Sequence, residues 1–173
     1  ALFMQAGVIR VDTLQEMFDL ASAMSEQPLP RGGRVGIISN AGGPAILCTD
    51  LCVHNGLWVP PLSSETRKRL MNVLPATARV ANPINAVESA GPDQFRDTVR
   101  MVLADQDIDA LIVSYAAIGS VDTAAIAAAI GEGVQAARQA GGDGKPVLIN
   151  LLPEAGEPMQ VRAGDETLPS YSF

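Results

Sequence analysis

Residues 35–44 read Val-Gly-Ile-Ile-Ser-Asn-Ala-Gly-Gly-Pro, an apolar run that meets two glycines and a proline. The run predicts a buried strand, and Pro44 predicts the first helical position because its fixed φ matches the helical value. The glycines predict a turn with positive φ, in which backbone N–H groups come close to a ligand. A helix N-terminus at such a turn attracts anions, phosphate above all. A plain strand-to-helix connection remains the alternative.

Strands and helices alternate along the rest of the chain. The expected strands cover residues 34–39, 57–59, 110–115 and 147–152, with a short extended piece at Val80 and a fifth strand within 168–171. The helices are expected to begin at Thr13, Pro44, Ser63, Pro92 and Asp122.

Two of these helices carry apolar residues at helical spacing. Leu14, Met17, Phe18 and Ala21 share one face of the first helix, and Ile46, Leu47, Leu51 and Cys52 are expected to point inward from the second. Asn55-Gly56 is expected to end the second helix with a left-handed cap.

Apolar strands separated by helices predict a parallel sheet that is covered on both faces. We therefore expect a flavodoxin-like three-layer sandwich with a parallel sheet of four to five strands. Residues 1–32 are expected to form an N-terminal helix and linker, and residues 33–173 one globular unit.

The charge balance disfavours whole classes of partner. The chain has 19 acidic and 12 basic residues and a net charge of -7, and its longest run of basic residues is the three at 67–69. Nucleic acids and anionic membranes are therefore not expected partners. The apolar runs fall short of the roughly 18 residues that span a bilayer, so we expect a cytoplasmic protein.

Ligands of parallel sheets bind beyond the carboxyl ends of the strands. The loops at residues 40–43, 82–85 and 116–120 are expected to form one rim at that edge. The predicted phosphate-binding groups are the backbone N–H groups of Asn40, Ala41, Gly42 and Gly43, with the Asn40 side chain as a further contact. Asn82 and Asn85 are the predicted rim residues, although Asn82-Pro83 is also typical of a simple turn.

The sequence offers no catalytic residue and no metal site. His54, the only histidine, is expected to cap a helix at the surface. Cys48 and Cys52 are interpreted as small buried apolar residues. Asp107 and Asp109 precede a strand, where carboxylates are expected to face solvent.

Several segments, taken together, resemble the NDP-forming acyl-CoA synthetases. They are residues 3–10, 13–20, 33–44, 62–66, 74–75, 82–83 and 109–113. The chain looks like one flavodoxin-type, CoA-ligase-like subdomain related to succinyl-CoA synthetase and cut from a longer polypeptide. Family members commonly have Asp in the position of Asn85, which places in doubt any role that needs a negative charge there.

The resemblance implies an enzyme that converts an acyl-CoA, phosphate and NDP into the acid, CoA and NTP through an acyl phosphate and a phosphohistidine. In such enzymes the histidine lies in a Ser-His-Thr-Gly loop outside this unit. CoA and ATP or ADP with Mg²⁺ bind to separate CoA-binding and ATP-grasp modules. This chain has neither the loop nor a nucleotide-binding motif. We therefore expect the isolated chain to bind no cofactor and to be inactive, with its glycine turn completing a phosphoryl site shared with another subdomain.

Two other functions remain open. Some protein acetyltransferases resemble these synthetases and carry such a unit as a structural or regulatory module. An independent flavin or nucleotide binder is the weaker alternative, because the turn lacks Ser and Thr and aromatic residues make up only 4% of the chain. A fold alone does not decide among these functions.

Overall fold

The computed structural model of the chain describes residues 5–117, 122–141, 144–152 and 161–171. Its centre is a five-stranded sheet in which every neighbouring pair is parallel. In spatial order the strands are β2 (Ile84–Asn85), β1 (Val35–Ser39), β3 (Ala110–Ala116), β4 (Val147–Leu152) and β7 (Ser170–Tyr171). The predicted flavodoxin-like class with four to five parallel strands is confirmed.

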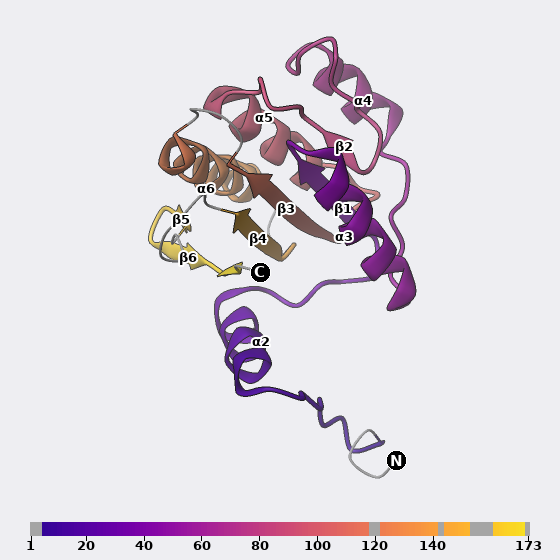
Figure 1. Cartoon of the computed structure of the whole chain (residues 1–173), viewed down its shortest axis with the longest axis vertical. Helices are drawn as coiled ribbons and strands as arrows, with labels where there is room; N and C mark the ends of the chain where they lie inside the picture. The colour runs from indigo at the N-terminus through magenta and orange to yellow at the C-terminus, as the bar shows by residue number, and fades with distance from the viewer. Residues whose placement is uncertain (1–4, 118–121, 142–143, 153–160, 172–173) are drawn as a thin grey trace.

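One face of the sheet carries the main hydrophobic core. The helices α5 (Pro92–Leu103) and α6 (Thr123–Gln139) pack against each other over this face (Figure 1). Phe95 of α5 meets Tyr115 of β3 edge to face, with ring centroids 5.5 Å apart. The two helices lie close together because a glycine stands at the contact: a Cβ at Gly133 would overlap the carbonyl oxygen of Arg96.

The other face carries α3 (Gly42–His54), which packs on β1 through a small cluster of Val35, Ile37 and Cys52. The helix α4 (Ser64–Met71) packs beside α5. A hairpin of β5 (Val161–Ala163) and β6 (Glu166–Leu168) packs on α6.

The helix α2 (Leu14–Glu26) lies to one side of the rest of the domain and is joined to β1 by an extended segment (Figure 1). That segment is attached through Gln27, whose side-chain oxygen accepts a hydrogen bond from the N–H of Val147 at 2.9 Å. The hydroxyl of Tyr171 also donates to the carbonyl of Asp19. Within the described residues, no helix is long and apolar enough to cross a membrane.

The predicted helix boundaries are confirmed at most ends. Thr13, Ser63 and Asp122 cap α2, α4 and α6 through their side-chain oxygens, and Pro92 occupies the first turn of α5. Gly56 follows α3 with φ of 78°, as its expected left-handed cap requires. The sheet edge differs from the prediction, because residues 57–59 form only a single bridge at Trp58 and the neighbour of β1 is instead β2.

The predicted inward faces are the main error. Ile46, Leu47 and Leu51 of α3 are exposed, and only Cys52 of the four residues expected inside is buried. The apolar face of α2 is exposed as well, with Leu14 at 72%. An amphipathic or all-round apolar pattern indicates that a helix is covered, but the covering surface need not belong to the same chain.

Candidate functional site

Two buried side chains hold the turn between β1 and α3 in place through hydrogen bonds. Ser39 is the last residue of β1, and its Oγ accepts a hydrogen bond from the N–H of Ala41 at 3.1 Å. Asn40 is only 4% exposed, and its amide forms two hydrogen bonds with the backbone of Ala116 at the end of β3. Its Nδ2 donates to the carbonyl at 2.7 Å, and its Oδ1 accepts from the N–H at 2.9 Å. Both ends of the amide are therefore engaged within the chain, and the Asn40 side chain holds the turn instead of facing a ligand.

The glycines of the turn serve a different purpose from the one predicted. Neither Gly42 nor Gly43 has a positive φ, because both already belong to the first turn of α3. Pro44 is consequently the third helical residue and not the first. It is tolerated there since the first N–H groups of a helix have no partner within the helix.

The helix α3 begins without a side-chain cap. Among the described residues, no acceptor is hydrogen-bonded to the N–H groups of Gly42 and Gly43. A Cβ built on Gly43 would meet nothing within 4 Å, so the space over this end of the helix is open. Two unpaired donors, the positive end of the helix dipole and open space together suit an anion.

The two predicted rim residues, Asn82 and Asn85, lie beside different parts of β1 along the strand direction. Asn85 pairs with Ser39 at the carboxyl end of β1, and a Cβ on Gly42 would lie 3.7 Å from its Nδ2. Its Oδ1 accepts from the N–H of Val87, which leaves the NH₂ group beside the turn. Asn82 instead bonds to the N–H of Ile37 and the carbonyl of Val35, in the amino half of β1. Residues 118–121 of the third predicted rim loop lie outside the described residues.

A row of polar residues that the sequence did not predict crosses the sheet next to the turn. The strand register aligns Asn85, Ser39, Ser114, Asn150 and Tyr171 across the five strands. Aligned residues of a parallel sheet point to one face, which here is the face that α3 covers. Ser114 and Asn150 are buried and hydrogen-bonded to each other at 3.4 Å. Each of them interrupts an otherwise apolar strand at the third position from its end, and this is the signal that could have identified the row.

The remaining candidates carry no chemistry at this edge. His54 lies in the exposed last turn of α3, as expected. Cys48 is half-buried and Cys52 buried, and burial raises the pKa of Cys48 to about 12. Both thiols therefore stay protonated near neutral pH and are poor nucleophiles. Within the described ranges, no three His, Cys, Asp or Glu side chains gather as metal ligands.

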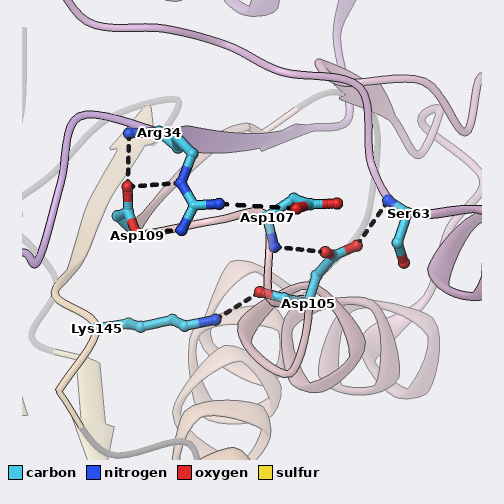
Figure 2. Close-up of polar contacts among 6 residues, drawn as sticks. All are labelled: Arg34, Ser63, Asp105, Asp107, Asp109 and Lys145. Carbon is cyan, nitrogen blue, oxygen red and sulfur yellow. Dashed lines mark hydrogen bonds and ion pairs between the residues drawn. The ribbon is translucent and has the colours of Figure 1, made fainter.

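The opposite edge of the sheet holds a network of charged side chains (Figure 2). Contrary to the expectation from the sequence, Asp109 does not face solvent. Its carboxylate accepts hydrogen bonds from the Arg34 guanidinium at 2.9 and 2.7 Å and from the Arg34 backbone N–H at 3.0 Å. These hydrogen bonds lower the pKa of Asp109 to about 2. Lys145 donates to the carbonyls of Leu103 and Asp105 just beyond α5, and burial lowers its pKa.

Asp105, at the centre of this network, accepts from the N–H groups of Ser63 and Asp107 at 3.0 Å each. Burial opposes ionisation of Asp105, but these hydrogen bonds prevail and its pKa is lowered. The network therefore fixes the beginnings of α4 and β3 against the end of α5.

The fold and the turn define a class: a parallel α/β domain that presents an uncapped helix N-terminus at the carboxyl edge of its sheet. Residues 35–165 match the family described as the Ligase-CoA domain, and the chain belongs to that family.

Relatives with assigned activities are similar over different parts of the chain. The alpha subunit of ADP-forming acetate–CoA ligase II from Pyrococcus furiosus is 34% identical over the whole chain, which spans 40% of that subunit. The ADP-forming 4-hydroxybutyrate–CoA ligase of Nitrosopumilus maritimus is 40% identical over 65% of the chain and 16% of its own length. The chain thus spans less than half of the length of each of these relatives.

Solved structures share the fold. A protein of Pyrococcus horikoshii OT3 superimposes with a TM-score of 0.76 at 34% identity, over 89% of this chain and 34% of its own. The dinucleotide-forming acetyl-coenzyme A synthetase 1 of Ca. Korarchaeum cryptofilum gives a TM-score of 0.82 at 24% identity, over 98% of this chain and 36% of its own.

Proposed function

We propose that this chain is one domain of an ADP-forming acyl-CoA synthetase, in which the N-terminus of α3 binds a phosphoryl group during transfer. The overall reaction converts an acyl-CoA, phosphate and ADP into the free acid, CoA and ATP. The observation that carries the proposal is the pair of N–H groups of the exposed residues Gly42 and Gly43, which have no acceptor among the described residues, in a member of the Ligase-CoA family.

The phosphoryl group arrives on a histidine of another part of the parent protein. The chain's own histidine, His54, lies at the opposite end of α3 from Gly42 and so cannot reach the turn. One helix N-terminus contributes at most about 2 kcal/mol to anion binding. This corresponds to a dissociation constant of roughly 30 mM, which is too weak to hold a phosphoryl group. A second set of donors from outside this chain must therefore complete the site.

The outer surface of α3 supports such a partner. Ile46, Leu47, Leu51 and Val53 are all exposed on the helix whose N-terminus forms the turn. Because these residues lie on the same helix as Gly42 and Gly43, a domain that packs on α3 also approaches the turn. The occupant we propose is the remainder of the parent protein, since the chain spans only 40% of the acetate–CoA ligase subunit.

The other substrates bind elsewhere in the parent protein. We assign CoA, the nucleotide and its Mg²⁺ to the proposed CoA-binding and ATP-grasp modules. A structure of the Ca. Korarchaeum cryptofilum synthetase, which shares this fold at 24% identity, holds phosphate and ADP. That complex supports phosphate and ADP as the substrates to test.

The test is ATP formation by the full-length protein. Acetyl-CoA and 4-hydroxybutyryl-CoA are each supplied with phosphate and ADP, and ATP and free CoA are measured. The proposal predicts equal amounts of ATP and CoA with at least one acyl-CoA, and none without phosphate. A folded protein that releases CoA only by acylating a protein lysine would instead show the acetyltransferase alternative to be right.

A further inference from the structure

A cleft of about 560 Å³ lies at the amino edge of the sheet, away from the glycine turn. Its lining includes the carboxylate of Asp109 and five of the 12 basic residues in a chain of net charge -7, which are Arg31, Arg34, Arg69, Arg100 and Lys145. They come from four separate segments of the sequence, since Arg31 and Arg34 lie three residues apart. The clustering is therefore a product of the fold, and it was invisible in the sequence.

Two of the five cations have structural partners. Arg34 is bound to Asp109 through two guanidinium hydrogen bonds, and Lys145 donates to the carbonyl of Asp105 (Figure 2). Lys145 also donates to the carbonyl of Leu103. Lys145 thus satisfies carbonyl groups at the end of α5, where the negative end of the helix dipole would otherwise repel an anion.

The other three guanidinium groups are weakly held or free. Among the described residues, Arg100 has only Asp97 as an ionic partner, at 3.6 Å in a half-buried pair one turn apart on α5. No ion pair or hydrogen bond within the described part of the chain involves the side chains of Arg31 and Arg69. Arg69 and Arg100 lie in the last turns of α4 and α5, where a cation gains about 0.3–1 kcal/mol from the helix dipole. That gain does not explain Arg31, which lies on no helix.

The rest of the lining is mostly small or apolar. It includes Leu103, Ala104, Ala137 and Ala140 at the ends of α5 and α6, with Gln106 as a polar member. Ligand pockets commonly enclose about 300–1,000 Å³ and combine an apolar surface with a few charged groups. Guanidinium groups are well suited to phosphate because their donors match its oxygens in pairs.

We propose that this cleft binds an organic phosphate of nucleotide size, with its phosphates on Arg31, Arg69 and Arg100 and its apolar body against Leu103 and the lining alanines. Because the cleft is at the other edge of the sheet from Gly42 and Gly43, a ligand there takes no part in phosphoryl transfer. It forms a second site, and its existence does not depend on the function proposed for the turn.

The test uses hydrogen–deuterium exchange of the full-length protein, since this measurement localises a ligand even where another nucleotide site exists. ADP, inorganic pyrophosphate and adenosine are compared at equal concentrations. ADP is expected to protect peptides covering residues 100–109 and 137–141, pyrophosphate to protect them less, and adenosine not at all. The double variant Arg31→Gln/Arg69→Gln should need at least about tenfold more ADP for half-maximal protection.

The matched control is Arg67→Gln/Lys68→Gln, which removes two exposed charges of α4 that do not line the cleft. This control variant should reach half-maximal protection at the same ADP concentration as the wild type. The proposal is overturned if ADP gives no protection of these peptides, if adenosine protects them as well as ADP, or if the control loses as much affinity as the cleft variant.

Discussion

At the scale of single residues, Asn40 shows how a predicted ligand contact becomes a structural element. The sequence places it directly after a strand and before two glycines, so a role in binding was a reasonable prediction. Its two hydrogen bonds to Ala116 cross 76 positions of the chain, and local spacing carries no information about such a partner.

We predict that Asn40→Asp destabilises the fold. A carboxylate can still accept from the Ala116 N–H, but it cannot donate to the Ala116 carbonyl, and the site is buried. The variant loses this hydrogen bond and leaves the Ala116 carbonyl without its donor, which should lower the free energy of unfolding by about 1–3 kcal/mol. Urea unfolding measures the change, and Asn72→Asp at an exposed position should cost well under 1 kcal/mol. Equal effects at both positions would contradict the buried clamp.

The ion pair of Asp109 with Arg34 predicts a pH dependence. The pKa of Asp109 is lowered from 3.8 to about 2, so its carboxylate stabilises the folded state above pH 4 and loses that effect as the pH falls toward 2. Asp109→Asn should therefore lower the free energy of unfolding at pH 7, and the difference from wild type should shrink between pH 4 and pH 2. Asp93→Asn, in an exposed pair with Arg96, serves as control and should change little at any pH. A wild-type advantage that is constant down to pH 2 would argue against the ion pair.

At the scale of elements, the sequence predicts what forms a helix better than what covers it. The Ser63 and Asp122 caps, Pro92 and Gly56 act within a few residues, so the ends of α4, α5, α6 and α3 were predictable. Which apolar residues of α3 are buried depends on distant surfaces, and Leu47 is 67% exposed in this chain. The strand β2 was missed because two residues carry no periodic pattern.

The exposed face of α3 predicts a binding defect without a folding defect. Leu47→Glu should leave the unfolding transition of this chain nearly unchanged, because the side chain has little contact to lose. It should weaken association with the rest of the parent protein, expressed separately, by at least about tenfold in sedimentation or calorimetry, since burial of a charge at an apolar interface is costly. Met71→Glu, on an equally exposed apolar residue of α4, is the matched control. If both variants bind as the wild type does, α3 is not the interface.

At the scale of the whole molecule, the chain is a well-formed domain with an incomplete site. The five-stranded sheet and its main core lie within the described residues, whereas the start of α3 offers an anion only the two N–H groups of Gly42 and Gly43 that lack an acceptor among those residues. The family relationship was predictable from several short segments together. The geometry of the turn was not, because glycines adjacent to a proline are compatible both with positive φ and with a helix start.

The isolated chain should therefore be folded and inactive. Incubated with acetyl-CoA, phosphate and ADP, it should form no ATP above background, while circular dichroism confirms its helices. Phosphate titrated into the isolated chain should bind with a dissociation constant above about 10 mM. Turnover by the isolated chain, or micromolar phosphate binding, would show that the site is complete without a partner.

The most direct measurement of the central claim is phosphorylation of the full-length protein by acyl phosphate with Gly43 changed. Because φ of Gly43 is not positive and its Cβ would meet nothing within 4 Å, Gly43→Val should fold with a cost of about 1 kcal/mol or less. The added side chain tilts toward the helix N-terminus and fills the space that the phosphoryl group needs.

We predict at least about a hundredfold loss of phosphohistidine formation in Gly43→Val and a smaller loss in Gly43→Ala. Gly91→Ala, at the N-cap of α5 where a Cβ is also unobstructed, should retain the wild-type rate. A folded Gly43→Val protein that is phosphorylated at the wild-type rate would contradict the account and show that the turn only connects β1 to α3.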